Sequence, residues 1–309
     1  MSETKIDISR ASKAIRDSRF VEALSMLESN LAKDPDHLES LYFAAVCSRY
    51  LKNYKDSQKY LENLLTKAPD MGRAYQELGH LSKAIGNDEN AASHYRQACE
   101  LNPALISSWK SLFNYFTKMK NKPAAEHAYE QIKKLESIPS VLLYINQILN
   151  EGRLGIAEKQ CREYLKKNPK DVYAMSLLAE IANRLGYFDD AEILLENAVK
   201  FSPNDGELRM KYAMILRKKQ KFAKTMEQVN ILCEQFPENL SYQAQKASEV
   251  MQNGDHGLAI ELFESIIEKN KFNFSALTSK GHAEKTLGKT DDAIESYKSA
   301  YKIKQDHGE

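Results

Sequence analysis

The sequence predicts an all-α protein, an α-solenoid of about nine helix–turn–helix repeats. The first observation is a period: prolines recur at intervals of 34 residues in two series, Pro35, Pro69 and Pro103, then Pro169, Pro203 and Pro237. The second is that small and large side chains fall into fixed columns when the chain is divided at this interval. A constant period of this length is the signature of stacked helical repeats.

The repeat boundaries follow from the proline period. Pro103 and Pro169 are 66 residues apart, so the two units between them include one that is two residues short. The second series continues at Lys271 and Gln305, which stand in similar contexts. The array is therefore expected to run from residue 4 to residue 309, in the repeats 4–37, 38–71, 72–105, 106–137, 138–171, 172–205, 206–239, 240–273 and 274–309.

Two columns predict how the two helices of each repeat interlock. Position 20 is always small: Ala23, Ser57, Ala91, Ala125, Ala157, Ala191, Thr225, Ala259 and Ala293. Position 8 is also small, except at Phe113 and Ile145. Position 24 is large or apolar: Leu27, Leu61, Tyr95, Tyr129, Cys161, Leu195, Val229, Phe263 and Tyr297. Small holes that face large side chains at helical spacing let two helices pack at native density.

The turn residues agree with this division. Glycine occupies position 15 in five repeats, at Gly86, Gly152, Gly186, Gly254 and Gly288. A helix commonly ends on a glycine because glycine adopts the left-handed conformation without steric cost. The proline at position 32 stops the second helix. Each repeat is thus a helix pair that buries its apolar face only by stacking on its neighbours.

Composition limits the function and the location. The net charge is +1, from 44 basic and 43 acidic residues, so bulk charge gives no argument for nucleic acid or a membrane as partner. The N-terminal segment has no apolar stretch typical of a secretory signal, and no window resembles a membrane span. The four cysteines are far apart and form no CxxC pair. We expect reduced, packed thiols in a cytoplasmic protein.

The columns resemble those of the tetratricopeptide repeat family, most clearly in AYQELGHLSKAIGNDENAASHYRQACELNP and SKGHAEKTLGKTDDAIESYKSAY. Trp109 occupies the aromatic position of that family, whereas Asp7, Arg209 and Gln243 depart from it. The resemblance implies a right-handed superhelix that binds a protein or a peptide. It also implies that the first helices line a concave groove through positions 2, 5, 6, 9, 12 and 13 of each repeat.

A narrower resemblance links the array to bacterial proteins that join such repeats to a sulfotransferase domain. It rests on GRAYQELGHL, NPALISSW and GHAEKTLGKTDDAIESYKSA, in that order. In that subgroup the catalytic domain follows the repeats, so we expect a longer parent protein. The chain itself has no Gly-rich phosphate-binding loop after a strand. We therefore expect no catalysis and no cofactor or metal within these residues.

The groove positions carry a net charge of +8, which favours an acidic, extended polypeptide as partner. The alternative is a solvated helix face that is basic by chance. The polar residues assigned to partner binding are Arg49, Arg73, His80, Lys83, Lys110, Asn114, Lys118, Arg184, Lys211, Arg217 and Lys218. Lys110 and Asn114 fit the first part of the carboxylate clamp found in co-chaperones of this family, but Leu143, Tyr173 and Leu177 do not fit the rest.

Two apolar groups complete the candidate site. Tyr42 and Tyr50 belong to an aromatic cluster in the second repeat, and Leu142 and Leu149 face the predicted groove in the fifth. Such groups mark partner sites when exposed; the alternative is that neighbouring repeats shield them. The short fourth repeat, followed by Pro139, is expected to bend the array.

Three functions remain open at this stage. They are a peptide-binding scaffold, the substrate-recruiting arm of a sulfotransferase, and a self-associating module. The last follows from Tyr297, Tyr301 and Ile303, which end the array without a polar capping helix.

Overall fold

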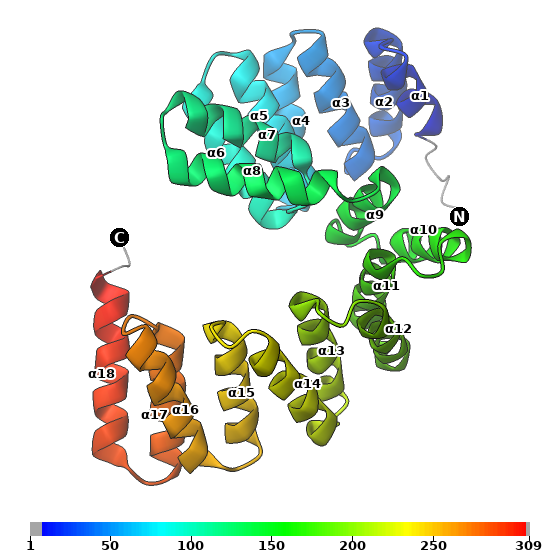
Figure 1. Cartoon of the computed structure of the whole chain (residues 1–309). Coiled ribbons are helices and arrows are strands. Elements are labelled where there is room, and N and C mark those ends of the chain that lie inside the picture. Colours follow the sequence, from blue (N-terminus) through cyan, green and yellow to red (C-terminus); the bar gives the residue numbers. More distant parts are fainter. Residues whose placement is uncertain (1–7, 307–309) are drawn as a thin grey trace. The chain divides into compact units, whose positions relative to one another are not determined.

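The computed structural model describes residues 8–306, which form eighteen α-helices and no strand (Figure 1). The start of the first predicted repeat, residues 4–7, and the end of the last, residues 307–309, lie outside the described residues. The chain divides into two compact units, unit 1 (Met1–Ala157) and unit 2 (Glu158–Glu309). The predicted all-α solenoid is confirmed: odd-numbered helices are the first helices of the repeats and even-numbered helices the second.

In unit 1, consecutive helices from α1 to α8 pack against one another. Helix α10 (Leu154–Lys167) begins in this unit and ends in the next. The remaining helices are α1 (Ser9–Arg16), α2 (Phe20–Lys33), α3 (Leu38–Tyr50), α4 (Tyr54–Lys67), α5 (Gly72–Ala84), α6 (Asp88–Leu101), α7 (Ile106–Lys118), α8 (Lys122–Glu136) and α9 (Ser140–Asn150).

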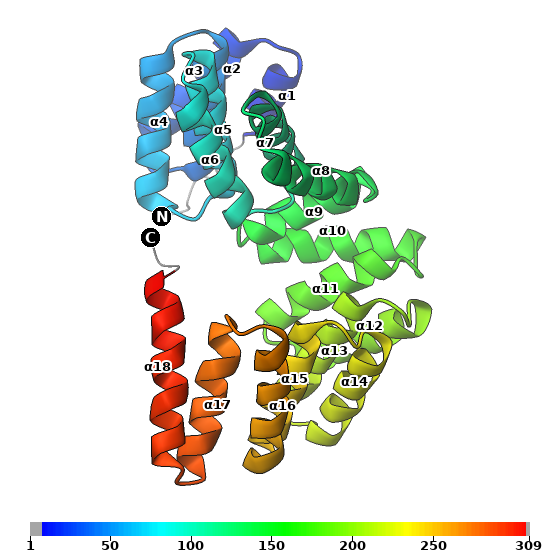
Figure 2. The same ribbon diagram turned by 60° about the vertical axis from the view of Figure 1, so that its left-hand side comes forward.

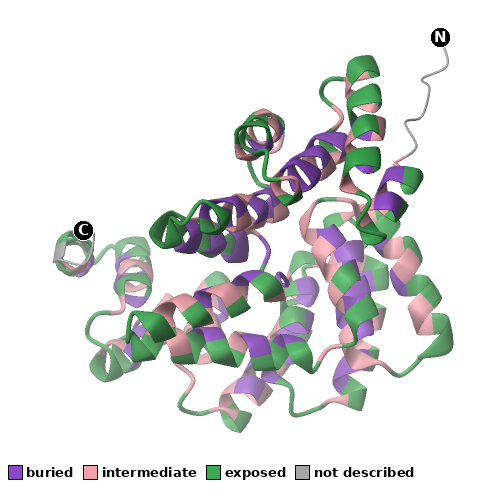
Figure 3. Cartoon of the chain, turned by 90° about the horizontal axis from the view of Figure 1, so that it is seen from above, coloured by how far each residue is buried: buried purple, intermediate pink, exposed green. Residues whose placement is uncertain are grey.

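In unit 2, consecutive helices again pack as pairs, from α11 to α18 (Figure 2). They are α11 (Val172–Arg184), α12 (Phe188–Phe201), α13 (Gly206–Lys218), α14 (Phe222–Gln235), α15 (Leu240–Gln252), α16 (His256–Lys269), α17 (Phe274–Thr286) and α18 (Thr290–Asp306). In both units the buried residues lie where helices face one another, and the outer turns are exposed (Figure 3).

The small and large columns meet within each repeat. Position 8 is glycine in the third and ninth repeats, where position 24 is tyrosine. A Cβ added to Gly79 would lie 2.5 Å from Tyr95 Cε1, and one added to Gly281 would lie 2.7 Å from Tyr297 Cε1. The tyrosine ring therefore fills the space that a methyl group would need. A tyrosine at position 24 requires glycine rather than alanine at position 8.

The fourth repeat breaks this rule with a visible result. Phe113 stands where other repeats have a small residue, and the ring of Tyr129 lies 5.8 Å from its ring, between centroids. Tyr129 is 51% exposed, whereas Tyr95 at the same position is 2% exposed. With two aromatic rings at one crossing, the second is displaced toward solvent.

Every repeat turns on a left-handed residue at position 15. The five predicted glycines have φ between +75° and +92°. The same conformation occurs at the four repeats without glycine, with φ of +57° at Ser18, +63° at Lys52, +56° at Lys120 and +57° at Gln220. The turn is thus imposed by helix packing even where the side chain disfavours it.

The thiols are packed as expected from the sequence. All four cysteines are free, and Cys47, Cys99 and Cys161 are buried. Burial raises the pKa of Cys47 to about 11 and that of Cys99 and Cys161 to about 12, so these sulfurs stay protonated and unreactive at neutral pH.

We expect Gly79→Ala to lower the free energy of unfolding by about 1–3 kcal/mol, because the methyl group would displace Tyr95 from a packed interface. Urea unfolding followed by circular dichroism measures the change. Gly155→Ala is the matched control: nothing lies within 4 Å of its added Cβ, so stability should be unchanged or slightly higher. Equal effects of the two substitutions would contradict the interlock.

We expect Gln220→Gly to raise the free energy of unfolding by about 0.5–1 kcal/mol, since glycine adopts positive φ without the clash of a Cβ. Lys224→Gly, in the first turn of α14, should lower it by up to about 1 kcal/mol through lost helix propensity. Thermal unfolding of both variants gives the comparison, and destabilisation by Gln220→Gly would show that the side chain makes a compensating contact.

Candidate functional site

Helix α9 contacts repeats that are distant in the sequence. It begins at Ser140, after Pro139 at its N-cap. Gln147 Nε2 donates to the carbonyl of Ala104 at 3.2 Å, and Asn150 Nδ2 donates to Asn102 Oδ1 at 3.1 Å. These bonds attach α9 to the loop between α6 and α7. Helix α9 follows the short fourth repeat and lies beside the N-terminal ends of α3, α5 and α7.

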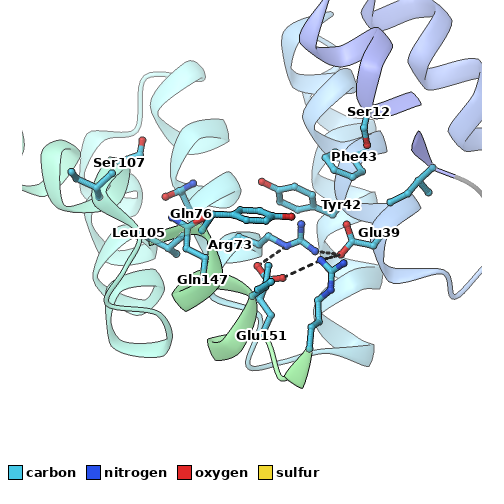
Figure 4. A pocket seen from close by; sticks show the side chains of 15 residues that line it. Ser12, Glu39, Tyr42, Phe43, Arg73, Gln76, Leu105, Ser107, Gln147 and Glu151 are labelled. Carbon is cyan, nitrogen blue, oxygen red and sulfur yellow. Dashed lines mark hydrogen bonds and ion pairs between the residues drawn. The ribbon is translucent and has the colours of Figure 1, made fainter. Parts of the chain in front are cut away.

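Four charged side chains join α9 to this face. Arg73 on α5 bonds Glu39 on α3, and its Nε lies 3.0 Å from Glu151 Oε1 at the end of α9 (Figure 4). Arg153 NH1 lies 3.3 Å from Glu39 Oε1 and 3.8 Å from Glu151 Oε2. The charges of these four side chains alternate in sign from one contact to the next, and they sum to zero.

This ion network is largely buried. The side chain of Glu151 is 7% exposed and that of Arg73 is 13% exposed. Burial raises the pKa of Glu151; Arg73 acts in the opposite sense, and Glu39 adds to the rise. Arg73 Nε and Glu151 Oε2 are both held by ion pairs within the network, at 3.0 Å from Glu151 Oε1 and at 3.8 Å from Arg153 NH1.

A pocket of about 400 Å³ lies beside the network. Its size falls within the range of ordinary ligand sites, about 300–1,000 Å³. Residues of α1, α3, α5, α7 and α9 line it: Ile8, Ser12, Glu39, Tyr42, Phe43, Arg73, Gln76, Leu105, Ile106, Ser107, Tyr144, Gln147, Ile148, Glu151 and Arg153. Figure 4 shows the ring of Tyr42 and the guanidinium of Arg73 close together, and their separation is 4.3 Å from Cζ to the ring centroid.

Two of the predicted cations of unit 1, Arg49 and Arg73, are therefore paired with carboxylates. Arg49 bonds Glu77 through Nε, with a second contact of 3.4 Å from NH2 to Oε2. Its guanidinium also stacks 4.4 Å from the ring centroid of Tyr50. Glu77 is 3% exposed, so Arg49 serves chiefly to neutralise a buried acid.

Tyr42 and Tyr50 differ in access. Tyr42 is half-buried beside the pocket, and burial raises the pKa of its hydroxyl well above the usual value. Tyr50 is 53% exposed but stacks on Phe20, with ring centroids 4.3 Å apart. Of Tyr42 and Tyr50, Tyr42 is therefore the one that a ligand in the pocket would contact.

Leu142 and Leu149 on α9 are 0% and 1% exposed. Of the two readings of this pair, an exposed patch or a shielded one, the structure favours the shielded one. Their burial is what holds α9 in place, because each buried leucine contributes about 1.5–3 kcal/mol.

His80 also makes an internal contact. Its Nδ1 lies 2.7 Å from the hydroxyl of Tyr95, whose ring packs against Gly79. Burial lowers the pKa of His80 to about 4, with smaller contributions from Arg49 and Lys83. The ninth repeat repeats the pair, His282 with Tyr297, at 3.0 Å.

A second pocket, of about 220 Å³, brings together three of the predicted residues, Lys83, Asn114 and Lys118, at the junction of α5, α6 and α7. Lys118 Nζ is 2.6 Å from Asp88 Oδ2, on the same junction. Lys110 lies outside this pocket and pairs with Glu136 at 2.7 Å. Both pairs are exposed, so they add little stability.

Unit 2 contains the remaining predicted cations, and they fall into two groups. Arg184 pairs with Glu180 at 2.9 Å, and Arg217 NH1 lies 3.3 Å from Glu249, whose side chain is 2% exposed. Lys211 and Lys218 instead bond neutral groups. Lys211 Nζ donates to Ser176 Oγ at 3.1 Å, and Lys218 Nζ donates to Asn183 Oδ1 at 2.7 Å.

Glu151 and Arg153 are site residues that the sequence did not single out. They occupy positions 14 and 16 of the fifth repeat, within the turn between its helices. The assumed groove positions exclude that turn. In the sequence, the short fourth repeat was the one irregularity that drew attention to the repeat in which Glu151 and Arg153 lie.

The family follows from comparison with known sequences. Models of the tetratricopeptide repeat match residues 72–105, and also residues 149–224 and 245–307. These ranges together cover more than half of the chain. The chain belongs to the tetratricopeptide repeat family. One of the unmatched stretches of this tetratricopeptide array, residues 106–148, includes the Phe113 crossing and nearly all of α9.

Several solved structures are similar in fold. A crystal structure of MamA is 18% identical, with a TM-score of 0.49, and the match covers 53% of this chain and 96% of that one. A second, titled "MamA RS-1 ArsTM double mutant", is 11% identical, with a TM-score of 0.48 and coverage of 54% and 97%. With these values the likeness supports no particular function. No curated protein matches the chain.

Two features are absent from the residues that the structure describes. None of their helices has the length and apolar character needed to cross a bilayer. No group of three or more His, Cys, Asp or Glu side chains among them could hold a metal ion.

We expect acid to destabilise unit 1 through His80. Its pKa is about 4 in the folded protein and about 6.5 in the unfolded chain, so the unfolded chain binds more protons between these values. The stability from neutral His80 is complete above pH 6.5 and is lost as the pH falls toward 4. Because the ring is partly exposed, the loss should be on the order of 2 kcal/mol.

The measurement is the free energy of unfolding between pH 7 and pH 4. In His80→Gln the fall over this range should be smaller than in the unmodified protein, because glutamine does not titrate. Parallel curves for the two proteins would rule out this origin of the acid sensitivity.

Proposed function

We propose that the tetratricopeptide array is a binding scaffold for other proteins, and that α13 binds an acidic, extended segment of a partner. The observation that carries the proposal is the bonding of Lys211 and Lys218. Among the described residues, neither ammonium group has a carboxylate within ion-pair distance, and both side chains are exposed. Their charge remains available to a ligand.

The two lysines lie on one face of α13 with Met214 between them. The spacing of three and four residues places these three side chains in one row. Met214 is 53% exposed. A flexible thioether between two cations suits a segment with an apolar residue between two acidic ones.

The spacing also suggests how far apart the acidic residues should be. Lys211 and Lys218 are separated by seven residues of helix, which corresponds to about 10.5 Å along the axis. An extended chain covers about 3.3 Å per residue, so two acidic side chains three residues apart span a similar length. The proposed ligand therefore has one acidic residue in every three.

Most of the other predicted cations support this choice by contrast, whereas Lys83 is likewise exposed and has no carboxylate within ion-pair distance among the described residues. Arg49, Arg73 and Lys118 in unit 1 already bond carboxylates of the same unit, as does Arg217 in unit 2. Binding an acidic ligand at those residues would require replacement of an existing ion pair. At Lys211 and Lys218 the contacts to be replaced are bonds to a hydroxyl and an amide, together with the contact of Lys218 Nζ at 5.5 Å from the ring centroid of Phe188. Hydrogen bonds that involve a charged acceptor are stronger.

The sulfotransferase-linked role and self-association stay predictions. The first rests on sequence resemblance alone. The second draws on α18, where Tyr301 is 62% exposed. Neither has a contact in the structure that favours it over peptide binding.

The test is binding of a fluorescently labelled peptide of repeating Glu-Leu-Pro, in which proline keeps the chain extended. The double substitution Lys211→Glu and Lys218→Glu should weaken binding by about a hundredfold or more, because repulsion replaces attraction at two sites. Fluorescence anisotropy measures the affinity. Raising the salt concentration should weaken binding to the unmodified protein.

The matched control is Lys224→Glu with Lys298→Glu, which makes the same change in net charge on the exposed faces of α14 and α18. It should leave the affinity nearly unchanged. Equal losses in the two double variants would mean that net charge alone attracts the peptide, and the proposal for α13 would fail. A Lys-Leu-Pro peptide that bound equally well would have the same meaning.

A further inference from the structure

The pocket at the junction of α5, α6 and α7 contains polar groups that are accessible to a ligand. Lys83 is exposed, and among the described residues no carboxylate lies within ion-pair distance of its ammonium group. The side chain of Asn114 is also exposed and makes no hydrogen bond to another described residue. The ammonium group of Lys83 and the amide of Asn114 can therefore bond a ligand without replacing an internal contact.

The charges that line this pocket favour a ligand with a single negative charge. Lys83 and Lys118 are basic and Asp88 is acidic, so the three together carry a net charge of +1. Lys118 Nζ donates to Asp88 Oδ2 at 2.6 Å; this bond and the charge of Lys118 lower the pKa of Asp88, with a smaller contribution from Lys83. Asp88 is thus held chiefly by Lys118. One carboxylate at Lys83 would balance the remaining charge, whereas a second negative charge would be repelled by Asp88.

The size and the lining of the pocket indicate one side chain of a partner rather than a whole small molecule. The volume of about 220 Å³ is below the range of ordinary ligand sites, about 300–1,000 Å³. Two buried alanines, Ala91 and Ala92, give the pocket an apolar surface. The methylene groups of a glutamate can pack there while its carboxylate reaches Lys83. The amide of Asn114 both donates and accepts, as does the backbone of an extended segment.

We propose that this pocket binds one glutamate side chain of an extended partner segment, with its carboxylate on Lys83 and its backbone on Asn114, and that Asp88 limits the bound residue to a single negative charge. The proposal rests on the proposed function only in treating the array as a scaffold that binds other proteins. It uses no residue of α13, so the two sites are tested separately.

The probes are peptides Ala-Pro-Xaa-Pro-Ala with both ends blocked, in which Xaa is glutamate, glutamine or phosphoserine and proline keeps the chain extended. Binding to the full chain is followed through the NMR shifts of the Asn114 side-chain amide. The glutamate peptide should bind saturably, with a Kd on the order of 1 mM, and the glutamine peptide about tenfold more weakly. The phosphoserine peptide should bind no more tightly than the glutamate peptide, because Asp88 repels its second charge.

Asp88→Asn tests the limit on charge. The substitution removes the repulsion and frees the ammonium group of Lys118 for the ligand. The phosphoserine peptide should then bind about tenfold more tightly than the glutamate peptide, because two ammonium groups face two negative charges. If the substitution left the relative affinities of the two peptides as they are in the unmodified protein, the role of Asp88 would be contradicted.

Lys83→Met tests the location, because it removes the accessible cation and keeps a long side chain. It should weaken binding of the glutamate peptide about tenfold, to the level of the glutamine peptide. Lys59→Met makes the same change on the exposed face of α4 and should leave binding unchanged. Both variants should keep the helical signal in circular dichroism. The double substitution Lys211→Glu and Lys218→Glu should also leave the shifts at Asn114 unchanged, so failure of the proposed function is seen separately.

Three further results would overturn the proposal. They are equal binding of the glutamate and glutamine peptides, equal effects of Lys83→Met and Lys59→Met, and binding that requires a free C-terminal carboxylate on the peptide.

Discussion

The structure depends on one packing constraint, the contact between a small residue on the first helix of each repeat and a large one on the second. Gly79 beneath Tyr95 and Gly281 beneath Tyr297 are its tightest forms. A helix pair that closes in this way fixes the position of every other side chain on the first helix. The row on α13 and the face that α9 contacts both lie on first helices that are held in this way.

This constraint explains why so much of the fold could be predicted. The columns were visible in the sequence because size at a crossing is a local property, set by two residues in one repeat. The same columns showed a large residue, Phe113, at a position that is small in most repeats. In the structure Tyr129, which packs beside Phe113, is half exposed to solvent. The turns were predicted only where glycine occurs; at Lys120 and Gln220 the backbone conformation is the same, but the side chain gave no sign of it.

The candidate site could be predicted only in part, because charge is not a local property. Counting cations on the first helices gave a basic groove. The carboxylates that neutralise several of them, Asp88, Glu136 and Glu249, occupy positions outside the counted set. Glu151 and Arg153 lie in a turn, and they reach Glu39 and Arg73 only through the placement of α9. Neighbouring residues decide which cations remain available to a ligand, and the list of positions within one repeat does not include those neighbours.

The contact between Arg153 and Glu39 has a consequence for how unit 1 folds. The two residues are 114 positions apart, whereas a repeat in a regular solenoid contacts only its immediate neighbours. A regular array can fold from any point and add one repeat at a time. In unit 1, α9 can make its contacts only after α3 and α5 have paired, so its docking is a late, non-local event that slows folding. A polypeptide emerging from the ribosome would therefore complete its first three repeats well before the ion network closes.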